Sequence, residues 1–202
     1  MTRYISILRG INVSGHKLIN MDALRKSYES LGFHDVVAYL QSGNIIFSTK
    51  QTAPEETAPE EAVTEKTAPE ETVAVELAHA ISRQIEKDFG FDVPVIVLSA
   101  NQLNEVIENN PFAKDSTKDK TFLHVTFLSS LPGNVNIHAL EEKKQGDEEV
   151  SLVGNAVYLY CPHGYGRTKL TNNFLETKLK VTATTRNWKT TNELSRIARS
   201  GL

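Results

Sequence analysis

The chain has 202 residues, of which 40% are apolar, a formal net charge of −3 and one cysteine, Cys161. This length is enough for one or two domains with a hydrophobic core, and one cysteine excludes an intramolecular disulfide. No stretch reaches the roughly 18 apolar residues of a membrane span, and the N-terminal apolar run meets Arg9 too soon for a signal peptide. We therefore expect a cytoplasmic protein without membrane contacts, and without a metal site because no Cys and His residues have zinc-ligand spacing.

Charge is unevenly distributed along the chain. Residues 155–202 carry eight basic side chains against two acidic ones, whereas residues 51–76 carry one lysine against eight glutamates. A basic region attracts anions whatever the net charge of the whole protein. The alternative is that these cations lie on solvated helix faces, and both interpretations stay open.

The first predicted elements are a strand, a helix and a hairpin. Residues 4–8 are predicted as a strand, and Asn20 is expected to cap a helix whose apolar residues repeat at helical spacing. Two strands at 36–40 and 45–48 follow, joined by a Gln-Ser-Gly-Asn turn at 41–44.

A low-complexity repeat interrupts this pattern. The sequence Thr-Ala-Pro-Glu-Glu occurs at 52–56, 57–61 and 67–71. Prolines break helices and central strands, and neighbouring glutamates repel each other, so residues 52–72 are predicted as a mobile acidic insertion. An acidic binding segment is the alternative.

The elements after the repeat complete a first domain at 1–98. Apolar spacing from Leu77 to Phe89 predicts a second helix, and residues 93–98 are predicted as a fourth strand. The order β-α-β-β-α-β is that of a ferredoxin-like unit, an alpha-beta plait in which two helices cover one face of an antiparallel sheet.

The second half starts the same order again. Ser99 with Gln102 predicts a capping box for a linking helix, and polar residues 113–120 are predicted as a hinge, so that 99–120 connect the domains. The further elements are predicted as a strand at 121–128, a helix near 136–143, strands at 150–153 and 157–160, a helix at 172–180, a strand near 182–185 and a closing helix capped by Thr190 with Glu193. The sequence thus predicts an α+β protein of two tandem ferredoxin-like domains with antiparallel sheets, the second at 121–202.

Two predicted strands, at 93–98 and 122–128, are apolar on both faces. An antiparallel sheet with one solvated face would alternate polar and apolar residues. We therefore expect the open face of each sheet to be covered, by the other domain or by a second copy of the chain.

Two N-terminal loops are candidate anion sites. The first joins the first strand to the first helix, where backbone N–H groups and the helix dipole can hold an anion. The second is the predicted hairpin turn. The alternative is structural, because glycine permits tight backbone geometry and Gly-Asn is a favourable turn. The candidate residues of these loops are Arg9, Gly10, Asn12, Ser42, Gly43 and Asn44.

The C-terminal quarter provides a further candidate. The loop at 164–169 precedes a helix and contains Gly166, Arg167 and Lys169, and arginine and lysine suit phosphate or carboxylate. Arg186 and Asn187, in a loop before the last helix, are predicted to reach the same ligand if the two loops meet.

The residues do not identify a reaction. The six histidines are dispersed, neither H-E-x-x-H nor G-x-S-x-G occurs, and neither catalytic residues nor a cofactor can be assigned. The first hypothesis is a binder of, or an enzyme acting on, a small anionic ligand. The alternatives are a nucleic-acid-binding protein and a structural or oligomeric interaction protein.

Several separated motifs resemble one protein family. These are Tyr4-Ile-Ser-Ile-Leu-Arg-Gly-Ile-Asn-Val13, Tyr39-Leu-Gln-Ser-Gly-Asn44, Asn110-Pro-Phe112, Gly164-Tyr-Gly-Arg-Thr-Lys-Leu170 and Thr185-Arg-Asn-Trp188. In this order they resemble the domain of unknown function 1697 family of bacterial proteins, with Ser14 and Thr168 where the family usually has glycine and serine. The resemblance implies two ferredoxin-like domains in tandem and implies no reaction.

Overall fold

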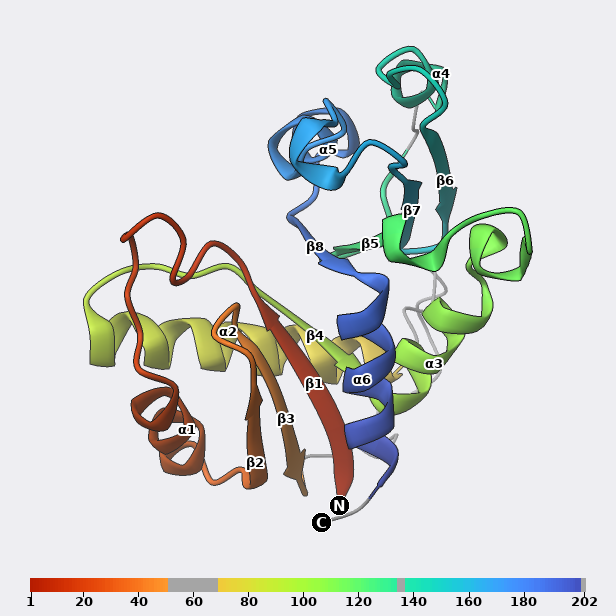
Figure 1. The fold of residues 1–202 in the computed structure, drawn as a ribbon. Helices are drawn as coiled ribbons and strands as arrows, with labels where there is room; N and C mark the ends of the chain where they lie inside the picture. The colour runs from red at the N-terminus through yellow and green to blue at the C-terminus, as the bar shows by residue number, and fades with distance from the viewer. Residues whose placement is uncertain (51–68, 134–136, 201–202) are drawn as a thin grey trace, which may run out of the picture. The chain divides into compact units, whose positions relative to one another are not determined.

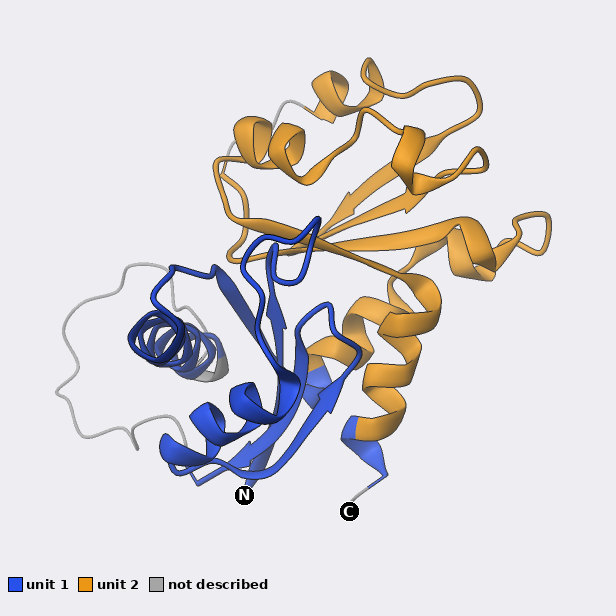
Figure 2. Cartoon of the chain, turned by 60° about the vertical axis from the view of Figure 1, so that its left-hand side comes forward, with its two compact units in different colours: residues 1–101, 198–202 blue, residues 102–197 orange. Residues whose placement is uncertain are grey.

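The computed structural model describes residues 1–50, 69–133 and 137–200 (Figure 1). It divides into two compact units: residues 1–101 with 198–202 form unit 1, and residues 102–197 form unit 2 (Figure 2). The chain is therefore a mixed helix and strand protein, and the predicted α+β class is confirmed.

Unit 1 is built on a four-stranded antiparallel sheet with the order β2-β3-β1-β4. The strands are β1 (Thr2–Leu8), β2 (His34–Tyr39), β3 (Asn44–Thr49) and β4 (Val95–Ser99), and the helices are α1 (Met21–Ser30) and α2 (Pro69–Phe89). These elements match the predicted ones to within a few residues, apart from the start of α2.

The ends of the helices follow from local chemistry. The Oδ1 atom of Asn20 accepts hydrogen bonds from the N–H groups of Asp22 and Ala23, which confirms the predicted cap of α1. Helix α2 begins at Pro69, so the last residues of the predicted insertion belong to a helix. Proline suits the first helical position because its fixed φ is helical and no N–H partner is needed there. The rest of the predicted insertion, residues 52–68, lies outside the described residues.

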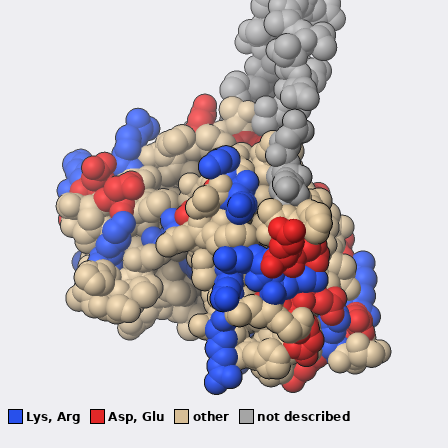
Figure 3. All heavy atoms as spheres, turned by 90° about the horizontal axis from the view of Figure 1, so that it is seen from above, with Lys and Arg blue, Asp and Glu red and all other residues tan. Residues whose placement is uncertain are grey.

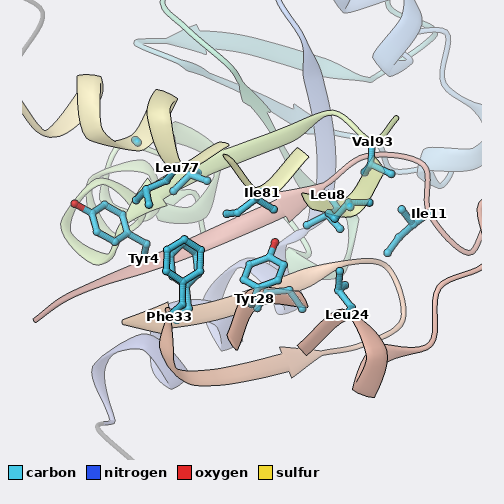
Figure 4. Close-up of a cluster of buried hydrophobic side chains, with 14 of the residues drawn as sticks. Tyr4, Leu8, Ile11, Leu24, Tyr28, Phe33, Leu77, Ile81 and Val93 are labelled. Carbon is cyan, nitrogen blue, oxygen red and sulfur yellow. The ribbon is translucent and has the colours of Figure 1, made fainter. Parts of the chain in front are cut away.

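The core of unit 1 lies between the sheet and its two helices (Figure 4). Phe47 stacks on Phe33 with ring centroids 4.5 Å apart and meets Tyr28 edge-on at 5.6 Å. The Tyr28 hydroxyl reaches Oγ of Ser6 at 2.7 Å, which satisfies a polar group inside the core. Helices α1 and α2 thus cover the face of the sheet from which Phe47 projects.

The opposite face of this sheet is buried as well. Ile5 and Ile7 on β1 and Ile46 on β3 alternate with the residues of that core, and each is at most 1% exposed. Both faces of this sheet are therefore buried, as its apolar strands indicated.

Unit 2 repeats the same element order. Its antiparallel sheet has the order β6-β7-β5-β8. The strands are β5 (Leu123–Leu128), β6 (Glu149–Val153), β7 (Ala156–Tyr160) and β8 (Ala183–Asn187), and the helices on one face are α4 (Ile137–Glu141) and α5 (Asn172–Leu179).

The segment predicted as a linking helix and hinge packs within unit 2. Helix α3 (Ala100–Glu108) is followed by two 3₁₀-helices, η1 (Pro111–Lys114) and η2 (Lys120–Phe122). The hydroxyl of Tyr158 on β7 donates a hydrogen bond of 2.7 Å to the carbonyl of Val106 on α3. Lys118, between η1 and η2, pairs with Glu149 on β6. The polar residues predicted as a hinge therefore make specific contacts with the sheet.

The last helix starts earlier than predicted. Strand β8 extends to Asn187, and α6 (Trp188–Arg199) follows directly. Oδ1 of Asn187 accepts a hydrogen bond of 2.8 Å from the N–H of Thr190. Asn187 therefore caps α6, and the predicted capping role of Thr190 is wrong, because Thr190 already lies inside the helix. Both residue types favour cap positions, so composition alone did not distinguish them.

No helix in the described ranges combines the length and the apolar character needed to cross a membrane.

Candidate functional site

The polar groups of unit 2 gather around the hydroxyl of Thr185, in the middle of β8. Its Oγ1 lies 2.7 Å from Oγ1 of Thr126, 3.0 Å from the hydroxyl of Tyr165 and 2.6 Å from Oδ1 of Asn172. An amide oxygen only accepts hydrogen bonds, so Thr185 donates its one hydrogen to Asn172. Thr126 and Tyr165 therefore both donate to Thr185, and each hydroxyl hydrogen of the cluster has an assigned acceptor.

Three parts of the fold bring these side chains together. Thr126 and Thr185 are direct partners across the antiparallel β5–β8 pair, so their side chains project from the same face. Asn172 is the first residue of α5, which is capped by the hydroxyl of Thr171. Tyr165 begins the 3₁₀-helix η3 (Tyr165–Arg167), which precedes α5.

His124 extends this cluster toward the start of β5. It lies two residues before Thr126, so it projects from the same face of the strand. Its ring stacks on that of Tyr165 with centroids 4.8 Å apart and an interplanar angle of 23°. We call His124, Thr126, Tyr165, Asn172 and Thr185 the Thr185 cluster.

The tautomer of His124 follows from its one hydrogen bond. Nδ1 lies 3.1 Å from the backbone carbonyl of Phe122, and since a carbonyl only accepts, Nδ1 carries the hydrogen. Burial lowers the pKa of His124, so the ring is neutral at neutral pH and Nε2 carries a lone pair. None of the described residues hydrogen-bonds to Nε2.

Two cations follow Tyr165 of this cluster on the loop 164–169. Arg167 and Lys169 are exposed, and neither forms an ion pair with a residue in the described ranges. Arg167 is separated from Tyr165 by one residue, the exposed Gly166. The guanidinium group is a planar fork for carboxylate or phosphate, whereas the lysine ammonium is a point charge.

Buried contacts hold this loop in place. The N–H groups of Gly164 and Arg167 donate to the carbonyls of Cys161 and Gly164, at 2.9 and 3.0 Å. Oγ1 of the buried Thr168 accepts a hydrogen bond of 3.1 Å from the N–H of Leu170. The cations are therefore displayed by an ordered loop.

Cys161 helps to hold the loop, because its carbonyl accepts the hydrogen bond from the N–H of Gly164. Burial, with a smaller contribution from the carboxylate of Glu148, raises the pKa of its thiol to about 12. Only a thiolate is a good nucleophile, so this thiol is unreactive at neutral pH. It lies directly after β7 and is fully buried.

Among the predicted residues of unit 1, the side-chain amides of Asn12 and Asn44 are bonded to groups of the loops themselves. Asn12 has a left-handed backbone with φ 54°. Its Nδ2 donates to the carbonyls of Ile19 and Gln41, at 3.1 and 2.9 Å, and its Oδ1 accepts from the N–H of Ile19 at 2.8 Å. Asn12 thus ties the loop that begins with Arg9 and Gly10 to the hairpin turn.

The turn itself is held in a similar way. Nδ2 of Asn44 donates to Oγ of Ser42 and to the carbonyl of Tyr39, each at 3.0 Å. The carbonyl of Gly43 accepts a hydrogen bond of 2.8 Å from the N–H of Leu8. Two N–H groups at the start of α1, those of Asp22 and Ala23, are already bound by the Asn20 cap.

Arg186 and Asn187 differ in their position relative to the loop at 164–169, because Asn187 pairs directly with His124 across β5 and β8. Both lie in β8 and not in a loop. Arg186 follows Thr185, so its side chain lies on the opposite face of the sheet, where burial lowers the pKa of the guanidinium to about 10. Its Nη1 donates to Oγ1 of Thr184 at 3.1 Å, and the side chain of Asn187 caps α6.

No member of the Thr185 cluster was among the candidate residues predicted from the sequence. One signal was present: His124 and Thr126 are alternate polar residues in a strand that is otherwise apolar. Alternation assigns them to one face, but their partners depend on the β5–β8 register. In the described residues no three His, Cys, Asp or Glu side chains gather as a metal site would require.

Together, the two units define a class of protein: an α+β chain with two four-stranded antiparallel sheets and the same element order in each. A solved structure supports this description. The conserved bacterial protein SP0830 from Streptococcus pneumoniae has a TM-score of 0.65 to this chain at 21% sequence identity, covering 98% of this chain and 99% of its own. At this identity the similarity concerns the fold alone.

The family is shown by sequence. The model of a family described as "protein of unknown function (DUF1697)" matches residues 1–75 and 63–158. The chain therefore belongs to the DUF1697 family, as its motifs indicated, and this family description names no reaction. No curated protein matches the chain significantly.

Proposed function

We propose that unit 2 binds a small ligand that carries a phosphate or carboxylate group, at the loop 164–169. The main support is that Arg167 and Lys169 are exposed, are without an ion pair among the described residues, and stand on an ordered loop beside the Thr185 cluster. The excess of basic residues at 155–202 raises the local concentration of anions.

A thermal-shift screen tests the proposal. Phosphate, sugar phosphates, nucleotides and dicarboxylates are added to the protein, and at least one is expected to raise the melting temperature, because a ligand of the native state stabilises it. Calorimetric titration then compares the parent with Arg167→Ala and Lys169→Ala, each of which should weaken binding about tenfold or more. Lys26→Ala, an exposed cation on α1, is the matched control for charge. A silent screen, or an Arg167→Ala protein that binds like the parent, overturns the proposal.

In this proposal the predicted residues of unit 1 stabilise their loops and do not bind the ligand. The side chains of Asn12 and Asn44 are bonded to the loops that they join. We expect Asn12→Ala to lower stability without changing the affinity for the anion, which separates the two roles.

We also propose that each unit is a ferredoxin-like domain. The support is the β-α-β-β-α-β order together with strand orders that place the first and third strands at the centre of each sheet. The domain boundaries predicted from the sequence, at 1–98, 99–120 and 121–202, are part of this proposal. The predicted cytoplasmic location is a separate proposal. Limited proteolysis that releases stable fragments with ends inside 99–120 would support the boundaries.

The geometry gives less support to nucleic-acid binding. RNA recognition on such a sheet uses exposed aromatic side chains of the central strands. Here Phe47 on β3, Phe127 on β5 and Tyr158 on β7 are each at most 1% exposed. On the face shown in Figure 3, basic and acidic side chains are interspersed. A gel shift with single-stranded RNA at low salt that shows no complex would end this alternative.

A further inference from the structure

We infer that the ligand of the loop 164–169 carries an O–H or N–H hydrogen-bond donor beside its anionic group, and that Nε2 of His124 accepts this donor. The inference rests on the proposed anion binding and adds the chemical class of the ligand. A hydroxylated phosphate or a hydroxy acid is the simplest compound of this class.

The first step is that the hydroxyl hydrogens of the Thr185 cluster are already used. Thr185 donates to Asn172, and Thr126 and Tyr165 donate to Thr185. These hydroxyls therefore cannot donate to a ligand without breaking the cluster. The charged side-chain donors of the loop are the two cations, which suit the anionic group.

The complementary acceptor is Nε2 of His124. The hydrogen bond from Nδ1 of His124 to the carbonyl of Phe122 fixes the tautomer, so Nε2 presents a lone pair. Stacking on Tyr165 at 4.8 Å fixes the plane of the ring. In a neutral tautomer of this kind Nε2 accepts a hydrogen bond and cannot donate one.

The third step is proximity. Tyr165 contacts His124 directly, and Arg167 follows Tyr165 after one residue in the same 3₁₀-helix. The Cα atoms of Tyr165 and Arg167 are therefore at most about 7.6 Å apart, since adjacent Cα atoms lie about 3.8 Å apart. One compact ligand with an anionic group and a nearby donor would engage both Arg167 and Nε2 of His124.

Matched pairs of ligands test the inference. The pairs are glycerol 3-phosphate with propyl phosphate, and lactate with propionate, which share their charge and differ in hydroxyl groups. The dissociation constants are measured by calorimetry with the parent chain. One additional hydrogen bond predicts that the parent binds the hydroxylated member about two- to tenfold more tightly.

Variants assign that preference to His124. His124→Phe keeps an aromatic ring for stacking and removes Nε2, and it should bind both members of each pair equally. His124→Gln keeps an acceptor oxygen and should retain part of the preference, and thermal unfolding verifies that both variants fold. Arg167→Ala should weaken both members by the same factor.

The outcomes separate the two claims. Binding without a preference for the hydroxylated member, or a preference that persists in His124→Phe, overturns the inference and leaves the anion site standing. Absence of binding by every probe overturns the anion site, and the inference falls with it. A long-range nitrogen–proton spectrum of the His124 ring that places the hydrogen on Nε2 would also overturn the inference.

Discussion

At the scale of single residues, Gly43 is the described glycine of unit 1 at which an added Cβ would meet the closest neighbours. Its φ is +78°, and a Cβ added there would lie 2.7 Å from Cβ of Leu8 and 2.8 Å from Cδ1 of Ile11. Backbone strain and overpacking add, so Gly43→Ala is expected to lower the free energy of unfolding by about 2–4 kcal/mol. Urea denaturation followed by circular dichroism measures this.

Gly10→Ala is the matched control for that prediction. Gly10 has φ +72° but no atom within 4 Å of an added Cβ. Only backbone strain remains, and we expect a loss of about 1 kcal/mol. If both substitutions lower the free energy of unfolding equally, the close contacts of an added Cβ with Leu8 and Ile11 do not contribute to the effect at Gly43.

His124 should make stability depend on pH. Burial lowers the pKa of His124 from the ordinary value of 6.5, so the unfolded chain takes up a proton at higher pH than the folded chain. At pH values between the pKa of His124 in the folded chain and its pKa in the unfolded chain, the unfolded state binds more protons than the folded state. The free energy of unfolding therefore falls as the pH drops below about 6.5.

The contribution of His124 is isolated by substitution. In His124→Phe, which cannot take up this proton, the fall in stability between pH 7.5 and pH 5.5 should be smaller than in the parent. Urea denaturation at both pH values measures the difference. His79→Phe, at an exposed position of α2, is the control and should retain the slope of the parent. An unchanged slope in His124→Phe would contradict the assigned burial effect.

Single residues also show the limits of prediction from sequence. Asn20 could be recognised as a cap because its partners are two and three residues away. The contacts of Asn12 with Gln41 and of Tyr165 with Thr185 join positions that are distant in the sequence. Such contacts depend on sheet register and loop conformation. The glycines and cations in the sequence therefore indicated the candidate loops but not the hydrogen-bond partners of their residues.

At the scale of elements, the start of α6 allows a direct test. Asn187→Ala removes the acceptor of the Thr190 N–H and should lower the free energy of unfolding by about 1 kcal/mol. Glu193→Ala, which would disrupt the capping box predicted from the sequence, removes only an exposed pair with Arg196 and should cost less than Asn187→Ala. The reverse result would restore the sequence-based start of the helix.

The other elements show why some boundaries were predictable. Strands β1, β3 and β7 are short, mostly apolar runs, helix α1 has apolar residues at helical spacing, and all were predicted to within about two residues. The segment at 111–122 is polar, and polar residues typically indicate a loop. Here Lys118 reaches Glu149 and lies over the rings of Phe112 and Tyr160, so tertiary contacts decided its structure.

At the scale of the whole molecule, the two units give a prediction about cooperativity. If each is a domain, destabilising unit 1 should open unit 1 first. In Gly43→Ala, hydrogen exchange is expected to accelerate in residues 1–50 far more than in residues 123–187. Mass spectrometry of peptides from both ranges measures this. Equal acceleration would contradict the proposal of two domains and indicate one cooperative unit.

The hydroxyl network around Thr185 has an evolutionary consequence. Thr126 is fully buried and donates to Thr185, so replacing Thr185 alone by valine leaves a buried hydroxyl without this acceptor, at a cost of about 1–3 kcal/mol. Replacing both threonines by apolar residues of similar shape costs less. Across the family the two positions should therefore change together, and an alignment of many members can reveal this correlation. The mark of this cluster in related sequences would then be a correlated pair of hydroxyl positions rather than an invariant residue.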